Sequence, residues 1–234
     1  MKKLYVIFTA LALLLLIIIS SSSRAETIVV PNDMPTIQQG IDDAKEGDTV
    51  LVAPGTYIEN LDYFDKSIVV TTLGGADSTF LQPADPNAIA VNIAGGNSSE
   101  TEFSGFTLSG GSNSHTIFIN NGASPVIKNN IFCYNLAVNK LDIAVVTCWD
   151  SVGVPVIERN IFYENLGKAC VWVMYGKAYI INNTFNANQS ASMCNSGQAT
   201  SLNNIVSGSL GTAVDGSYAE LDYVCFFNND IDFG

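Results

Sequence analysis

Residues that could carry out acid–base chemistry are scarce in this 234-residue chain. Beyond residue 25 it holds one arginine, Arg159, which follows Glu158 in the phrase "IERN". An arginine beside a charge neutraliser could serve as the base of a lyase that removes a proton next to a sugar carboxylate. An ordinary surface ion pair explains the same two residues, and it is the interpretation we favour.

The other candidates for proton transfer lack a supporting motif. Lys140, Lys168 and Lys177 stand alone in the sequence, and His115 in "SNSHTIF" is the only histidine. A single histidine at the start of a strand is more often a surface residue than a catalyst. The sequence therefore yields no confident catalytic residue, with Arg159 and Glu158 as the weak candidates.

The two tryptophans suggest binding instead of catalysis. Four β-rich runs each end near a glycine, at Gly122, Gly153, Gly176 and Gly197. The residue four positions before each glycine is large, and these residues form the column Phe118, Trp149, Trp172 and Met193. Neighbours along a strand point to opposite faces, so this column points outward if the smaller residues beside it point inward. Rings stacked about 4.8 Å apart would form a flat apolar platform for sugar rings.

Asp150 and Tyr175 lie close to these tryptophans in the sequence and would add polar contacts to the platform. With Phe118, they complete the predicted substrate-binding set. Two other arrangements remain open at this point. If the large residues of each run point inward instead, the tryptophans are buried in the core. Alternatively, the inserted segment around residues 133–142 could cover them.

Recurring phrases indicate which elements position these side chains. "PVIKNNIF", "PVIERNIF", "AYIINNTF" and "TSLNNIV" each follow a glycine, and each lies between β-rich runs. The repeat is roughly 22 residues long, which is typical of a solenoid. In every copy an asparagine precedes an apolar residue by two positions; these asparagines are Asn130, Asn160, Asn183 and Asn204.

Strand runs this short cannot bury an apolar face alone, whereas stacked coils hydrogen-bond to their copies above and below. We therefore expect an all-β fold, a single-stranded right-handed parallel β-helix of about seven coils. The four asparagines should form a structural ladder, since an amide side chain can bond both to its copies and to the turn backbone. A leucine-rich repeat has a similar period but requires a consensus that is absent here.

The chain divides into three parts. Residues 1–25 have a basic start, an apolar run and small residues before Ala25, as a signal peptide does. Residues 26–47 form a cap segment with an amphipathic helix, in which Ile37, Ile41 and Ala44 share one face and Thr36 is the N-cap. Residues 48–234 form the β-helix, whose C-terminal end lacks an evident cap.

One segment of the sequence resembles a known family. "TIQQGIDDAKEGDTVLVAPGTYIENL" is similar to the entry segment of the pectin-lyase-like right-handed β-helix proteins, especially the exported bacterial β-helix repeat proteins. The resemblance covers essentially the whole chain after residue 25. It implies the fold and a role at a surface or on polysaccharide, but no single reaction. The catalytic phrases of the pectin methylesterases and polygalacturonase-like hydrolases of this fold are missing here. Gly40 replaces the usual alanine, at a cost to the helix of up to about 1 kcal/mol.

Charge narrows the choice of partners. The net charge is −12, and it becomes −15 once a cleaved leader removes Lys2, Lys3 and Arg24. Such a surface argues against nucleic acid and anionic lipid as partners. No motif requires a cofactor, although an acidic protein could hold Ca²⁺ with its carboxylates. The five cysteines have no metal-ligand spacing, and we expect buried thiols, with a disulfide framework as the alternative.

Three functions remain after these exclusions. The favoured one is a secreted or cell-surface protein, without a membrane span after signal cleavage, that contacts polysaccharide or a surface glycan without catalysis. The second is a polysaccharide lyase or other carbohydrate-active enzyme, with Ca²⁺ as its cofactor. The third is a structural or adhesive module from a longer surface protein. The sequence carries no signal for an oligomeric state.

Overall fold

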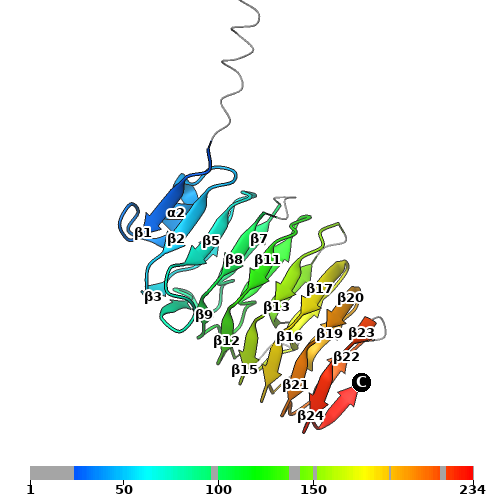
Figure 1. The fold of residues 1–234 in the computed structure, drawn as a ribbon. Helices are drawn as coiled ribbons and strands as arrows, with labels where there is room; N and C mark the ends of the chain where they lie inside the picture. Colours follow the sequence, from blue (N-terminus) through cyan, green and yellow to red (C-terminus); the bar gives the residue numbers. More distant parts are fainter. Residues whose placement is uncertain are drawn as a thin grey trace, which may run out of the picture.

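The chain forms a parallel β-helix. The computed structural model describes residues 24–95, 100–136, 143–149, 152–189, 191–216 and 220–233. Over these residues the backbone winds through about eight turns, and each turn adds a strand to each of three parallel sheets. The turns follow one another along an elongated solenoid, with the C-terminus at the far end from helix α2 (Figure 1). The predicted fold is confirmed, with about one turn more than expected.

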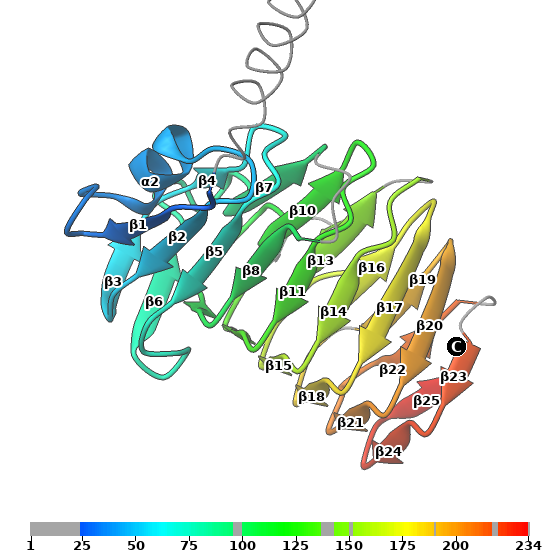
Figure 2. The same ribbon diagram turned by 45° about the horizontal axis from the view of Figure 1, so that its top comes forward.

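The three sheets run along the length of the solenoid (Figure 2). Sheet 1 contains, in order, β1 (Thr27–Val30), β2 (Thr49–Val52), β5 (Val69–Thr72), β8 (Glu102–Ser104), β11 (Val126–Lys128), β14 (Val156–Glu158), β17 (Lys177–Ile181), β20 (Gln198–Leu202) and β23 (Glu220–Asp222). Sheet 2 contains β3 (Gly55–Ile58), β6 (Thr79–Gln82), β9 (Thr107–Leu108), β12 (Ile131–Cys133), β15 (Ile161–Tyr163), β18 (Thr184–Asn186), β21 (Ile205–Ser207) and β24 (Cys225–Phe227). Sheet 3 contains β4 (Leu61–Asp62), β7 (Val91–Ala94), β10 (Ile117–Asn120), β13 (Ala144–Trp149), β16 (Ala169–Val173), β19 (Ala191–Asn195), β22 (Thr212–Asp215) and β25 (Ile231–Phe233).

Like residues stack inside the solenoid because successive turns pair in step. In sheet 2, Phe132 pairs with Phe162, which pairs with Phe185. Their rings stack with centroids 4.7 and 4.8 Å apart and planes 10° and 8° from parallel. All three side chains are fully buried, so the repeated apolar position becomes a continuous aromatic column in the core.

The four predicted ladder asparagines stack beside this column. Each is buried, and the Nδ2 group of Asn130 donates to Oδ1 of Asn160 at 3.2 Å. The chain of amides continues from Asn160 to Asn183 and from Asn183 to Asn204, at 3.1 Å in both steps. Each Nδ2 group also donates to a strand carbonyl, such as that of Ile127. The ladder thereby satisfies the backbone groups that the turn between sheets 1 and 2 would otherwise bury unpaired.

A second ladder, absent from the sequence prediction, lies five residues further along each turn. Asn135, Asn165 and Asn188 are buried, and their amides bond in series at 3.1 Å in both steps. Ser209 follows at the same offset, and its backbone N–H donates to Oδ1 of Asn229. This ladder supports the turn between sheets 2 and 3, so two of the three corners are held by stacked amides.

Helix α2 (Ile37–Asp43) packs against the first turn of the solenoid. The Thr36 hydroxyl caps it by accepting a hydrogen bond from the Gln39 backbone N–H, and Ile37 and Ile41 are fully buried. Gly40 has a packing reason: a Cβ there would lie 2.9 Å from a methyl carbon of Val50. The missing side chain lets the helix approach the strands closely and offsets the loss of helix propensity.

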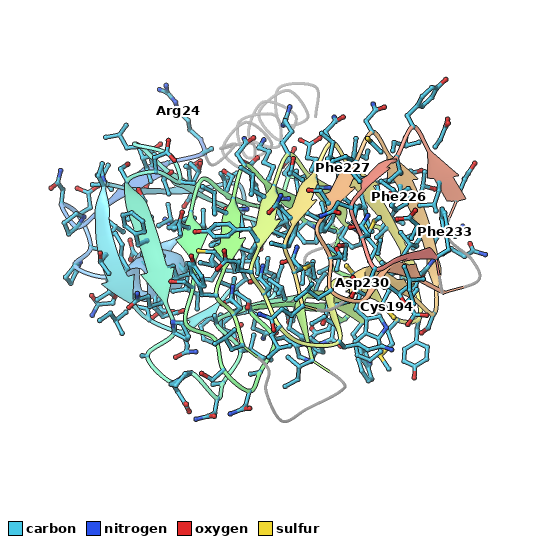
Figure 3. All side chains as sticks on the ribbon, turned by 90° about the horizontal axis from the view of Figure 1, so that it is seen from below. Arg24, Cys194, Phe226, Phe227, Asp230 and Phe233 are labelled. Carbon is cyan, nitrogen blue, oxygen red and sulfur yellow. The ribbon has the colours of Figure 1, made fainter. Side chains whose placement is uncertain are left out.

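The last described turn exposes several apolar side chains. Phe227, Ile231 and Phe233 are more than half exposed, and β23, β24 and β25 are the final strands of their sheets. Figure 3 shows Phe226, Phe227 and Phe233 at this end of the molecule. The predicted signal peptide falls almost wholly outside the described residues. Among the residues that are described, no helix is long and apolar enough to cross a membrane.

Candidate functional site

The outer face of sheet 3 carries the aromatic residues singled out from the sequence. Ile119 of β10 and Cys148 of β13 point into the core, where both are buried. Their neighbours Phe118 and Trp149 therefore point outward, as strand alternation requires. Trp149 is 41% exposed, and Tyr175, which follows β16, is 60% exposed.

These side chains form a row, which we call the aromatic row: Phe118, Trp149 and Tyr175. The ring centroids of Phe118 and Trp149 are 6.2 Å apart, and those of Trp149 and Tyr175 are 5.5 Å apart. The ring planes are inclined by 47° and 81°. The row therefore crosses three successive turns, but it is a ridge of inclined rings and not the flat platform predicted.

The prediction that Trp172 stacks beside Trp149 was wrong. Trp172 pairs with Thr147 on one side and with Cys194 on the other, and it is 4% exposed. It lies in a small cluster outside the main core, with Ala144, Ala169 and Cys194. Its Nε1 has no hydrogen-bond partner among the described residues. Met193 is also misplaced by the prediction, because it is buried in the main core.

A difference in turn length explains this error. Counting from the glycines placed Trp149 level with Phe118, but Phe118 pairs with Thr147 and Asn120 pairs with Trp149. Gly153 does lie against the preceding turn, since a Cβ there would meet the carbonyl oxygen of Ala123 at 2.1 Å. The segment between β13 and Gly153 is therefore longer than its counterpart after β10, and Trp149 is displaced by two residues along the strand.

A charged pair borders the Trp172 cluster. The Lys168 ammonium lies 3.4 Å from the Asp215 carboxylate, and the Cys194 sulfur lies 3.7 Å from the same oxygen. Burial raises the pKa of the Cys194 thiol, although Lys168 opposes the effect. The pKa of Lys168 is raised by the negative charge that Cys194 would carry as a thiolate and by the nearby Asp215. Burial acts in the opposite direction and lowers this pKa. Figure 3 shows Cys194 in the C-terminal half of the solenoid. The thiol therefore stays protonated and the amine stays charged, so neither is a ready nucleophile or base.

His115 adjoins the start of the aromatic row. Its ring stacks on Phe118 with centroids 5.1 Å apart, and its Nδ1 lies 2.8 Å from the Thr147 hydroxyl. The same nitrogen lies 3.3 Å from the backbone N–H of Ala144. These contacts hold the imidazole against the sheet, which makes it a support for Phe118.

The catalytic candidates Arg159 and Glu158 lie on another sheet. Arg159 occupies the turn after β14 in sheet 1, with φ of 55°, and its guanidinium pairs with the Glu158 carboxylate. This is the ordinary exposed ion pair favoured from the sequence. Asp150 and Lys140 fall outside the described residues. Within the described part of the chain, no three His, Cys, Asp or Glu side chains gather as metal ligands would.

None of the described cysteines forms a disulfide, and the expectation of buried thiols is confirmed for four of the five and wrong for Cys225. Cys133, Cys148, Cys170 and Cys194 are buried, and Cys225 is exposed. The spacing of these residues gave no sign of which one would lie at the surface.

Comparison with known proteins gives no basis for assigning a function to this chain. No family model matches this chain. No curated protein matches it either. A solved structure, the crystal structure of an alginate lyase from Paenibacillus sp. str. FPU-7, aligns with 88% of this chain and 99% of its own, at 11% identity and a TM-score of 0.38. A likeness this distant does not bear on what this chain binds.

Proposed function

We propose that this protein is a secreted or cell-surface β-helix protein that binds polysaccharide along the aromatic row without cleaving it. The observation that carries the proposal is the outward row of Phe118, Trp149 and Tyr175 across three successive turns. Successive turns of a β-helix are about 4.8 Å apart, close to the repeat of one sugar residue in an extended glycan. A polymer of sugars lying along the solenoid axis would thus meet one ring at each turn.

The exposure of the row favours binding over a purely structural role. Trp149 and Tyr175 keep large apolar surfaces in contact with water, and exposed aromatic surface of this kind usually marks a contact site. Rings with a polar tip present both an apolar face to the C–H groups of a sugar and a hydrogen-bonding group to its hydroxyls. The inclined rings suit a chain that twists from one residue to the next.

The chemistry around the row argues against catalysis. Among the described residues, Lys168 beside the Trp172 cluster has a raised pKa and stays charged, and Arg159 is engaged with Glu158 on a different sheet. A lyase base must be able to accept a proton near neutral pH. That no cofactor is required, although the carboxylates could hold Ca²⁺, stays a prediction, as does export.

Affinity electrophoresis of the purified protein tests the binding proposal. Gels would contain plant, algal or bacterial polysaccharides, with and without Ca²⁺, and at least one should retard the wild type. Trp149→Ala and Tyr175→Ala should lose the retardation, while Tyr223→Ala, which removes a still more exposed ring outside the row, should keep it. Equal retardation of all variants would refute the row as the contact site.

A chain-end assay on the same panel tests the absence of catalysis. Incubation with each polysaccharide should release no new reducing or unsaturated ends, with or without Ca²⁺. Release from any one of them would overturn the non-catalytic part of the proposal and favour the lyase alternative.

A further inference from the structure

The outer face of sheet 2 differs from the faces of the other two sheets because it carries no charge. None of the eight strands of this sheet contains an aspartate, glutamate, lysine or arginine. Outward positions of the other sheets do carry charged residues, namely Asp62, Glu102, Lys128, Glu158, Lys177, Asp215 and Glu220. In a chain of net charge −12, an uncharged stretch across eight turns is unexpected for a surface that meets only water.

The register of sheet 2 lines up its outward side chains in two rows. The aromatic column of Phe132, Phe162 and Phe185 points inward, so the residues on either side of each phenylalanine point outward. The residues that precede the column and its equivalents are Thr56, Phe80, Thr107, Ile131, Ile161, Thr184, Ile205 and Cys225. The residues that follow it are Ile58, Gln82, Cys133, Tyr163, Asn186, Ser207 and Phe227. We call these two rows the sheet 2 face; its strands β12, β15, β21 and β24 follow one another along one side of the solenoid (Figure 1).

Apolar side chains stand out from the sheet 2 face. Ile161 and Ile205 are 42% and 48% exposed. The preference of strands for branched side chains explains isoleucine and threonine here, but it does not keep charges off an exposed strand, as Lys128 and Glu158 on sheet 1 show. An exposed apolar face of this kind usually marks a contact with another protein.

The charges beside the face indicate that its partner is a second copy of the chain. Arg159 lies in the turn before β15 and Glu164 in the turn after it. A twofold axis along the solenoid, between two copies, reverses the strand direction and sets Arg159 of each copy against Glu164 of the other. The exposed pair of Arg159 with Glu158 is worth little, so the guanidinium is available to a second carboxylate. Asp77 and Asp85, which flank β6, lie three turns from β15, where packed sheets that cross at about 30° have diverged.

The size of the face suits a dimer. Eight strands about 4.8 Å apart span about 34 Å, and the residues from Arg159 to Glu164 span about 17 Å at about 3.3 Å each. Contact over this area would cover roughly 550 Å² of each copy in projection, or roughly 1,100 Å² together, which reaches the about 1,000 Å² expected of a biological interface. Homodimer interfaces are also more apolar than the rest of a protein surface.

We propose that the protein forms a twofold dimer in which the sheet 2 faces of two copies pack together, centred on β15. Facing isoleucines and threonines supply the attraction, and the two pairs of Arg159 with Glu164 fix the orientation. Sheet 3, with the aromatic row, stays outside this interface. The dimer therefore forms whether or not the row binds polysaccharide.

Size-exclusion chromatography with multi-angle light scattering tests the dimer. The purified protein should show twice the mass of one chain at about 100 µM, which is well above a dissociation constant of about 1 µM. Ile161→Lys places a charge in the middle of the face and should give monomers. Tyr179→Lys is the matched control, because Tyr179 is 44% exposed in β17 of sheet 1, and it should stay dimeric. Ile205→Lys replaces Ile161→Lys if far-UV circular dichroism shows that the first variant does not fold.

Charge reversal tests the orientation. Arg159→Glu and Glu164→Arg should each weaken the dimer about tenfold, because each sets like charges against one another across the interface. The double variant should restore the dimer, which a folding defect in either single variant could not do. A double variant as weak as the single ones would overturn the proposed axis.

Three results would overturn the interface itself. The first is a monomeric wild type at the same concentration. The second is a dimer that survives Ile161→Lys; if Phe233→Lys then abolishes it, the contact lies at the last turn. The third is a monomeric protein whose retardation in polysaccharide gels is lost in Ile161→Lys, which would assign the face to glycan.

Discussion

Replacing Asn160 by alanine should be among the most destabilising changes on this chain. The side chain is 1% exposed and sits in the middle of the first ladder. Its Oδ1 accepts from the backbone N–H of Asn130 at 3.0 Å, and its Nδ2 donates to the Ile127 carbonyl at 2.8 Å. It also bonds to the amides above and below it, Asn130 and Asn183.

The size of the effect follows from the groups left without partners. In Asn160→Ala the Asn130 N–H loses its acceptor and the Ile127 carbonyl loses a donor, both in the buried interior. Each unsatisfied buried group costs about 1–3 kcal/mol, so the variant should lose roughly 3–5 kcal/mol of unfolding free energy. Total stabilities of about 5–15 kcal/mol make this a large fraction.

Urea unfolding followed by far-UV circular dichroism measures the loss. Asn186→Ala is the matched control, because Asn186 also bonds to its neighbour in the next turn, Ser207 at 3.0 Å, but is exposed to solvent. That change should cost under about 0.5 kcal/mol. If the two variants unfold within about 0.5 kcal/mol of each other, the reasoning that the buried ladder holds the turns is refuted.

Three further predictions concern the core and the thiols. Phe162→Ala should cost about 3–5 kcal/mol of unfolding free energy, because Phe162 is fully buried between two stacked rings. The control Phe227→Ala, at a 71% exposed site, should cost under about 0.5 kcal/mol. Similar urea midpoints for the two variants would contradict the aromatic column. An aromatic disulfide reagent should modify one thiol quickly in the native protein, Cys225, and all five after unfolding; a fast reaction elsewhere would contradict the burial described. Burial raises the pKa of Cys148 to about 12 from an ordinary value of about 8.5. The protonated thiol therefore contributes stability that is complete below about pH 8.5. This contribution is lost at about 1.4 kcal/mol per pH unit as the pH rises toward 12. Cys148→Ala should flatten this alkaline decline in urea unfolding, and an unchanged slope would argue against a buried thiol.

The sequence predicts the corner between sheets 1 and 2 well because its length never changes. The turn residues Asn129, Arg159, Asn182 and Asn203 share one left-handed conformation, with φ between 53° and 57°. Each ladder asparagine therefore follows its strand at a constant offset, and counting along the chain gives the true register. The second ladder has the same regularity, and its five-residue spacing from the first was available in the sequence.

The face that carries the aromatic row was harder to predict. The connection after sheet 3 differs in length from turn to turn, so counting from the glycines shifted Trp149 by two residues and paired the wrong rings. The outward direction of Phe118 and Trp149 was still predicted, because strand alternation is local.

The fluorescence of Trp149 tests the central claim most directly. In a Trp172→Phe background Trp149 is the only tryptophan, and excitation selective for tryptophan reports on it alone. That replacement removes no hydrogen bond made to a described residue, since Trp172 Nε1 has no partner there. Titration with the polysaccharide that retards the protein in gels should shift the emission to the blue, saturably, and protect the ring from quenching by iodide. An unchanged spectrum with a polysaccharide that still retards the protein would contradict the account, because the glycan would then bind elsewhere.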